Sequence, residues 1–348
     1  MLVHICCSVD SFYFICRLKK DYPDEKIIGY FYDPNIHPKS EYDLRCLEAR
    51  RSCEILGAEF IEGDYDDKNW FAGVKGYESE PENSKRCELC FDIRLLRSAC
   101  LTKDLKEKIF TTTLLMSPKK NLKKLEKSAK KAEEISGASF IFLDYRKNGG
   151  TQEQFLMAKQ MQTYRQNYCG CMFALNDQRQ RQKRPSEELF CNIYKKVLPC
   201  SIDERLELFK KRRELELSGE ICQIKKQNFL NYRQLFARLS LDGKTIPSYF
   251  LWYSHSNQKK FKVSPADKEK AFFFTPRDLG LKSLQDLKKL TIKEEMLLRE
   301  KLGFFNFDMS VLIVTQKIEN EKYLVELNSQ IYQDLRFFLD LERDKYLF

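Results

Sequence analysis

The sequence predicts an α/β protein: a parallel sheet of about five strands flanked by helices, followed by a C-terminal α+β module. In the first 180 residues, short apolar segments rich in β-branched and aromatic residues alternate with longer helical patterns. This alternation is typical of parallel strands joined by helices. After Cys171 comes the polar, basic, proline-containing stretch NDQRQRQKRPSEE, and the alternation then ends. We therefore expect two domains, residues 1–180 and 181–348.

The elements expected in the first domain follow one another in a regular order. The strand-like segments are residues 2–6, 26–32, 58–61, 108–113 and 139–143. The clearest helical pattern begins at Ser40 as N-cap, has an acidic residue three positions later, and stops at Gly57. A second helix is expected to start near Pro118, because proline suits the first helical position. A third is expected to follow Gly150 and to reach about Tyr164.

The second domain is expected to be an α+β module. Helical patterns cover residues 187–198 and 203–217. The segment FLNYRQLFARLSLDGKTIPSYFLWYSH then places the pair Asp242-Gly243 between two strand-like runs. Such a pair is a strong signal for a tight β-hairpin, so we expect a hairpin or meander here.

Composition excludes several classes of protein. Of the 348 residues, 43% are hydrophobic and 32% are charged, and no apolar run approaches the roughly 18 residues of a membrane span. The N-terminus does not resemble a secretory signal, so a cytoplasmic protein is expected. In that reducing compartment, the 13 cysteines favour metal or redox chemistry over a disulfide framework. The net charge of +10 suits a polyanionic partner such as RNA.

Six of the cysteines occur as close pairs. These are Cys6 with Cys7, Cys87 with Cys90 in a CxxC, and Cys169 with Cys171 in a CxC. A CxxC can bind a tetrahedral metal or part of an iron–sulfur cluster, or act as a redox pair. A CxC can share a metal or form a strained, easily reduced disulfide. The neighbours Cys6 and Cys7 can face one ligand only if the strand has ended before them, because consecutive strand side chains point to opposite faces. Otherwise they are two buried thiols with no shared ligand.

The first loop of the chain resembles a nucleotide-binding loop that has lost its glycines. In pyrophosphatase-type loops that bind ATP, the first strand is followed by SGGxDS, whose glycines let backbone N–H groups approach phosphates. Here the same positions read CCSVDS, so the final Asp-Ser is kept while both glycines are cysteines. An ATP-using activity is therefore disfavoured. Asp10 is then either an oxygen ligand beside the thiolates or a helix cap.

Six motifs in this order resemble one known family. They are HxCCxxD, YDPNIHPKSEYDLR, RCELCFDIRL, TTTLLMSPKKN, DYRKNGG and YRQNYCGC. Over roughly residues 1–175 the chain is similar to the QueH-type epoxyqueuosine reductases, which are independent of cobalamin, and the rest is an extension. The resemblance implies a fold of the ATP-pyrophosphatase (HUP-like) group and two-electron reduction of epoxyqueuosine, at the anticodon of tRNA, to queuosine. It also implies a [4Fe-4S] cluster, an additional iron nearby and an electron donor that the sequence does not identify.

The resemblance also implies roles for single residues. The implied cluster ligands are Cys6, Cys7, Cys87 and Cys90. Cys169 and Cys171 would form a redox-active pair, as a disulfide when oxidised. Many relatives have a third cysteine where this chain has Asp10. In this chain, Asp10 would hold the second iron or deliver a proton. The residues expected to contact tRNA or the modified base are Tyr32, Arg45, Arg146 and Arg165.

Two other functions stay open at this point. A tRNA sulfur transferase of the same fold would also carry a cluster, but it should need ATP, and the missing glycines argue against that. A non-catalytic RNA-binding protein could instead use the CC and CxxC thiols to hold a structural zinc ion.

Overall fold

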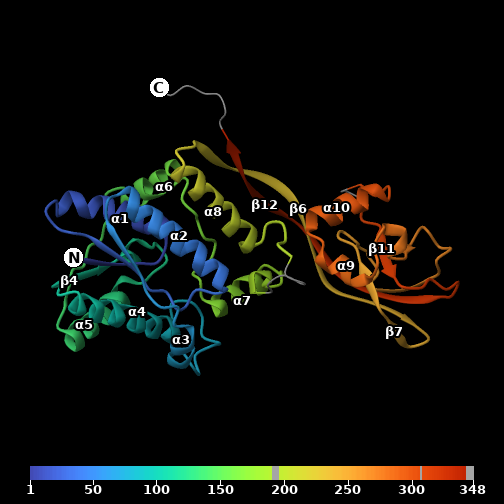
Figure 1. Cartoon of the computed structure of the whole chain (residues 1–348). Coiled ribbons are helices and arrows are strands. Elements are labelled where there is room, and N and C mark those ends of the chain that lie inside the picture. The colour runs from blue at the N-terminus through green and yellow to red at the C-terminus, as the bar shows by residue number, and fades with distance from the viewer. Residues whose placement is uncertain (190–195, 306–307, 342–348) are drawn as a thin grey trace. The chain divides into compact units, whose positions relative to one another are not determined.

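The structure is a computed structural model that describes residues 1–189, 196–305 and 308–341 (Figure 1). These residues form two compact units. Unit 1 comprises residues 1–189, 205–224 and 340–341, and unit 2 comprises residues 196–204, 225–305 and 308–339. This division differs from a single boundary near residue 180. The segment 205–224 returns to unit 1 because Phe209 packs against Leu44 and Tyr164, which both belong to the first 180 residues.

Unit 1 contains the predicted parallel sheet. Its strands are β1 (Leu2–Ile5), β2 (Ile28–Phe31), β3 (Glu59–Glu62), β4 (Ile109–Thr112) and β5 (Ser139–Phe140). All pairings are parallel and the order is β3-β2-β1-β4-β5, so Leu2 of the central strand lies opposite Ile28 and Phe110. β1, β2 and most of β4 are buried, as expected for strands covered on both faces. The predicted fold class is confirmed.

Helices cover both faces of this sheet. The helices of unit 1 are α1 (Ser8–Asp21), α2 (Lys39–Ile55), α3 (Asp67–Gly73), α4 (Lys85–Asp104), α5 (Leu122–Ser136), α6 (Gly150–Gln160), α7 (Met172–Arg181) and most of α8 (Ile202–Leu217), with short 3-10 turns η1 (Thr113–Met116) and η2 (Glu187–Leu189). In Figure 1, α4 and α5 lie on the face of the sheet away from α1 and α2. Right-handed crossovers produce this two-sided arrangement.

Three helix boundaries differ from the sequence prediction. α2 begins after Pro38 rather than at Ser40, because the Pro38 carbonyl accepts the first helical N–H groups. α5 begins after Asn121, four residues later than predicted. The Asn121 side chain caps the helix by accepting a hydrogen bond from the Lys124 backbone N–H at 3.2 Å. α6 ends at Gln160, short of Tyr164. Only η2 of the helix expected over 187–198 is seen, and residues 190–195 lie outside the described part.

Unit 2 is an α+β module, as predicted. One sheet has the order β10-β11-β8 and the other β7-β6-β12-β9. The strands are β6 (Cys222–Leu241), β7 (Lys244–Ile246), β8 (Ser248–Phe250), β9 (Lys260–Val263), β10 (Ala271–Phe274), β11 (Val311–Thr315) and β12 (Tyr323–Leu341), with η4 (Arg277–Leu279), α9 (Leu284–Lys289) and α10 (Ile292–Lys301). The predicted hairpin is confirmed: Asp242 and Gly243 both have positive φ, as a type I′ turn requires, and Leu241 pairs with Lys244. Among the described helices, none is both long and apolar enough to cross a membrane.

Candidate active site

The first cysteine group lies at the carboxyl edge of the parallel sheet. β1 ends at Ile5, so Cys6 and Cys7 follow it in a turn, and Cys7 is the N-cap of α1. Cys6 Sγ lies 4.0 Å from Cys7 Sγ and 4.0 Å from Asp10 Oδ2. One ligand atom from each of the three residues lies within 4.8 Å of the others, which is close enough to hold one metal ion. Asp10 makes no helix-capping bond and instead accepts a hydrogen bond from Gln154 Nε2 at 2.5 Å.

The electrostatics of this group favour a bound cation. Burial raises the pKa of Asp10 to about 6. The hydrogen bond with Cys6, together with burial, raises the pKa of Cys7 well above its usual range. A metal ion would reverse both shifts, because its charge stabilises a thiolate and a carboxylate. The donor set of Cys6, Cys7 and Asp10 therefore fits a metal site.

The second cysteine group surrounds a small cavity beside α4. Cys87 and Cys90 lie in the first turns of α4, Cys171 is the N-cap of α7, and Cys169 precedes it. All four line this one cavity. Burial is the main cause that raises the pKa of Cys87, the pKa of Cys90 to about 11 and the pKa of Cys171 to about 12, and negative charge on Cys169 adds to each rise. Cys169 and Cys171 are both free thiols in this structure, and the disulfide expected of the oxidised pair stays a prediction.

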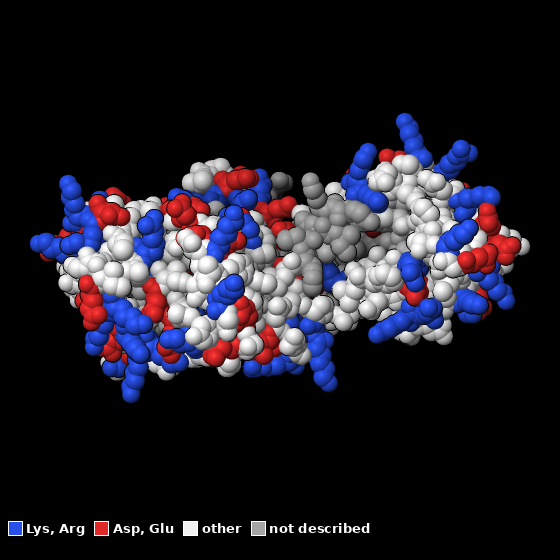
Figure 2. Space-filling view, turned by 90° about the horizontal axis from the view of Figure 1, so that it is seen from below, with Lys and Arg blue, Asp and Glu red and all other residues white. Residues whose placement is uncertain are grey.

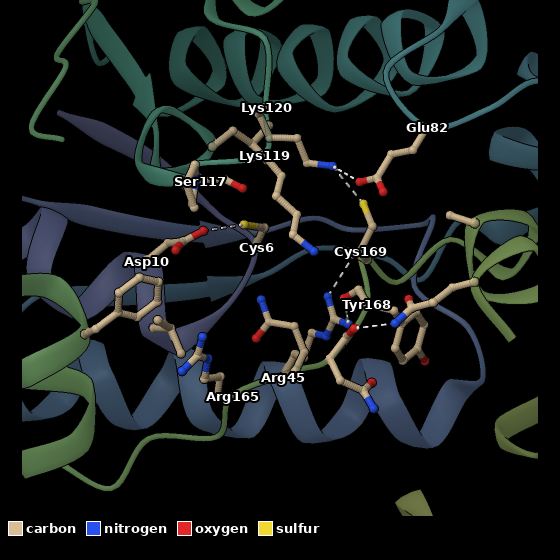
Figure 3. Close-up of a pocket in the computed structure, with 18 of the residues that line it drawn as sticks. Cys6, Asp10, Arg45, Glu82, Ser117, Lys119, Lys120, Arg165, Tyr168 and Cys169 are labelled. Atoms are coloured by element: carbon tan, nitrogen blue, oxygen red, sulfur yellow. Dashed lines mark hydrogen bonds and ion pairs between the residues drawn. The ribbon is translucent and has the colours of Figure 1, made fainter. Parts of the chain in front are cut away.

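A larger cavity of ≈ 440 Å³ adjoins both groups (Figure 3). Cys6 and Asp10 line one side and Cys169 the other, and Lys119 reaches between them. Lys120 donates a hydrogen bond to Cys169 Sγ at 3.1 Å. Burial acts to raise the pKa of Cys169, but the charge of Lys120 outweighs it, and the pKa is lowered. Because Cys169 and Lys120 line both cavities, the two cysteine groups open onto one chamber.

Two of the predicted substrate residues line the chamber. Arg165 is exposed, and its guanidinium lies 4.7 Å from the Phe155 ring centroid. Arg45 is buried, and it donates to the carbonyls of Cys169 and Tyr168, each at 3.0 Å. Gly170 permits this close approach: it has φ +113°, and a Cβ there would lie 2.9 Å from Ile36. Arg45 therefore holds the CxC loop in place.

Tyr32 and Arg146 lie elsewhere. Tyr32 is buried, its ring stacks on Tyr30, and its hydroxyl donates to Asp66 at 3.3 Å, so no ring face is free for a base. Arg146 pairs with Asp144 at 3.1 Å and donates to the Ser117 carbonyl at 3.2 Å. It supports the loop before α5, and it is not among the residues that line the chamber.

A buried polar network behind the CxC loop was not predicted. The Tyr164 hydroxyl donates to Glu41 at 2.8 Å, and Glu41 also pairs with Arg45 at 2.7 Å. The Tyr164 backbone N–H donates to Glu48 at 2.9 Å, and Glu48 pairs with Arg212 of α8. Glu41 and Arg45 follow ordinary i,i+4 spacing on α2, and Glu48 follows three residues later, a pattern that also describes a solvated helix face. Only their tertiary contacts reveal that the extension reaches the loop.

Comparisons with known proteins identify the family. A family model described as "Epoxyqueuosine reductase QueH" matches residues 1–177. The protein of that name from Helicobacter pylori is 32% identical and covers 97% of this chain and 100% of its own length. The one from Thermotoga maritima is 36% identical and covers 54% of this chain and 96% of its own length. The extension is thus shared with the first relative and lies outside the match to the second. The chain belongs to the epoxyqueuosine reductase QueH family.

Proposed function

We propose that this protein is an epoxyqueuosine reductase, which removes the epoxide oxygen of epoxyqueuosine in a tRNA anticodon and leaves the alkene of queuosine. The reaction consumes two electrons and two protons and releases one water molecule. One observation carries the proposal: in a chain of this family, two cysteine groups and Asp10 meet at one chamber.

The donor atoms fit an iron–sulfur cluster with an additional iron. Cys87, Cys90, Cys169 and Cys171 line one cavity as free thiols, so we assign them to the cluster. Cys6, Cys7 and Asp10 form the separate three-donor group, which we assign to the additional iron. Buried Arg94 and largely buried Lys120 line both cavities and offset the negative charge of the thiolates. When bound, the cluster would supply single electrons and the iron a Lewis acid for the epoxide oxygen.

The family resemblance divides the same six thiols differently. It makes Cys6 and Cys7 cluster ligands with the CxxC pair, and it makes Cys169 and Cys171 a dithiol that yields two electrons and two protons on forming a disulfide. The double variant Cys169→Ser/Cys171→Ser separates the two divisions. Our assignment predicts that it loses cluster iron and sulfide. Retention of a full cluster with loss of turnover would establish the dithiol role instead.

Asp10 is the residue best placed to act on the departing oxygen. Its Oδ1 is held by Gln154 while Oδ2 faces Cys6 at the chamber wall. If Asp10 is not an iron ligand, its pKa of about 6 lets part of the population hold a proton near neutral pH and give it to an oxygen bound nearby, whereas a bound metal would keep Asp10 ionised. Asp10→Asn separates its two roles: loss of the additional iron identifies a ligand, and retained iron with slow turnover identifies the acid.

The chamber suits a modified base at the end of an exposed tRNA loop. Its volume lies within the usual range for small-ligand sites. Arg165 and Lys119 are exposed cations on its lining, which would meet the flanking phosphates. Figure 2 shows Lys and Arg side chains projecting from the surface around unit 2 as well. This charge supports tRNA as the partner.

One assay tests the proposal. Anaerobically reconstituted protein, a chemical reductant and epoxyqueuosine-containing tRNA are incubated without ATP, and the digested nucleosides are analysed by mass spectrometry. We expect queuosine, formed by a brown protein that contains iron and sulfide. Absence of queuosine, while the Helicobacter pylori relative forms it in parallel, would overturn the proposal, as would a colourless protein that binds zinc stoichiometrically.

A further inference from the structure

The cavity of the second cysteine group is also lined by three buried nitrogen donors. Trp70 of α3 is 0% exposed, and Arg86 and Arg94 of α4 are each 2% exposed. Trp70 Nε1, Arg86 Nε and Arg94 Nε have no hydrogen-bond partner among the described residues. Buried N–H groups are almost always paired, so three unpaired donors around one cavity point to an acceptor that belongs inside it.

Other contacts fix both arginine side chains at the cavity wall. Arg94 forms an ion pair with Asp33 through Nη2. Arg86 donates from Nη1 to the Glu78 carbonyl at 2.7 Å, and its guanidinium lies 5.4 Å from the Phe173 ring centroid. These bonds use the outer nitrogens and leave each Nε–H unpaired, so the arginines cannot turn to find another acceptor without breaking them.

Trp70 is fixed by aromatic packing. Its ring stacks on Phe173 at a centroid distance of 6.0 Å and packs against His37 at 5.4 Å. Trp70 packs in one buried cluster with Cys90 and Cys171, and all three residues line the cavity. The unpaired indole N–H therefore lies among the thiols that would hold the cluster.

We propose that Trp70, Arg86 and Arg94 donate hydrogen bonds to the sulfur atoms of the iron–sulfur cluster and raise its reduction potential. This inference rests on the proposed cofactor, and it holds for either division of the ligands because both include Cys87 and Cys90. Reduction adds negative charge to the cluster sulfurs, which N–H donors and guanidinium groups stabilise more strongly than they stabilise the oxidised cluster. The three are positioning residues that tune the electron supply.

Trp70→Phe is the sharpest test, because it removes one N–H and keeps an aromatic ring. The control is Trp252→Phe: Trp252 is the only other tryptophan in the chain, is buried in unit 2, and also has an unpaired Nε1. We expect Trp70→Phe to keep wild-type iron and sulfide content, to shift the midpoint potential to a more negative value, and to lose one exchangeable-proton coupling of the reduced cluster in ENDOR spectra. Trp252→Phe should match wild type.

Arg86→Lys provides a second variant, which keeps the positive charge but removes the Nε donor. It should shift the potential in the same direction, and it replaces Trp70→Phe if that protein fails to hold a cluster. Wild-type potential and proton couplings in a variant with a full cluster would overturn this inference and leave the proposed function standing. Wild-type protein that assembles no cluster would overturn both.

Discussion

Arg212 is predicted to be the main link between the C-terminal extension and the active-site loop. It projects from α8 and pairs with Glu48, and each side chain is 1% exposed. Arg212 also donates to the Gln162 carbonyl at 2.7 Å, and Glu48 accepts the Tyr164 backbone N–H. Arg212→Met keeps much of the side-chain volume and removes the charge, so Glu48 loses its buried ion-pair partner and keeps only the charge of Arg51 nearby.

The expected cost is large. Removing one partner of a buried ion pair typically destabilises a protein by about 3–5 kcal/mol, because the remaining charge is uncompensated. The nearby pair Arg213–Glu54 is partly exposed, and exposed pairs contribute about 0–1 kcal/mol. Arg213→Met is therefore the matched control. The double variant Glu48→Gln/Arg212→Met should recover most of the lost stability, because it removes both charges of the pair. The new side-chain amide oxygen at position 48 can still accept the hydrogen bond from the Tyr164 backbone N–H.

Urea unfolding of the metal-free protein measures these values. Trp70 lies in unit 1 and Trp252 in unit 2, so a Trp252→Phe background confines the fluorescence signal to unit 1. We expect the free energy of unfolding to rank the control variant above the double variant and the double variant above Arg212→Met. A loss for Arg212→Met no greater than that for Arg213→Met, or no recovery in the double variant, would show that the Arg212–Glu48 pair does not stabilise unit 1.

Three further predictions follow from single contacts. Lys120→Met should slow alkylation of Cys169 in metal-free protein, followed by mass spectrometry, because Lys120 stabilises the thiolate; an unchanged rate would contradict this. Burial lowers the pKa of His4 well below 6.5, so on acidification the unfolded chain takes up the proton first and stability falls below about pH 6.5. With His4→Gln, the free energy of unfolding, measured by urea titration between pH 5 and 7.5, should fall less steeply on acidification. An identical fall in the variant would exclude His4 as its cause. Neutralising Lys260 and Lys262, exposed on one face of β9, should weaken tRNA binding and reduce the salt dependence, by about 1 in log–log slope for each lost phosphate contact; an unchanged slope would show that they touch no phosphate.

The sheet of unit 1 could be predicted because its strands are short apolar runs separated by turn residues. The first residue of a helix is harder to predict than a strand, because two residues close in sequence can both suit a helix N-terminus. Pro118 and Asn121 both suit a helix N-terminus, and only the bond from Lys124 N to Asn121 decides between them. The sequence does not reveal that unit 1 includes residues 205–224, because α8 joins unit 1 through tertiary contacts, the packing of Phe209 and the pair Arg212–Glu48.

The site was predictable in its residue types and not in their grouping. Close spacing singled out the six cysteines, but sequence cannot show that the CxC loop meets the start of α4 at one cavity. Arg45 and Tyr32 were expected to contact substrate because local patterns do not reveal burial. Trp70 and Arg86 carry no sequence signal of their own beyond the position of Arg86 next to Cys87, since an unpaired N–H is a property of the folded state.

The most direct test is a single-turnover reduction in which a chemical reductant supplies both electrons. Reconstituted protein, in excess over epoxyqueuosine-containing tRNA, is kept reduced by that reductant in the absence of ATP. We expect queuosine to form as the electrons pass one at a time through the cluster, and none to form with the Cys87→Ser/Cys90→Ser variant. If fully reduced, iron-loaded wild-type protein forms no queuosine, the proposed function is wrong.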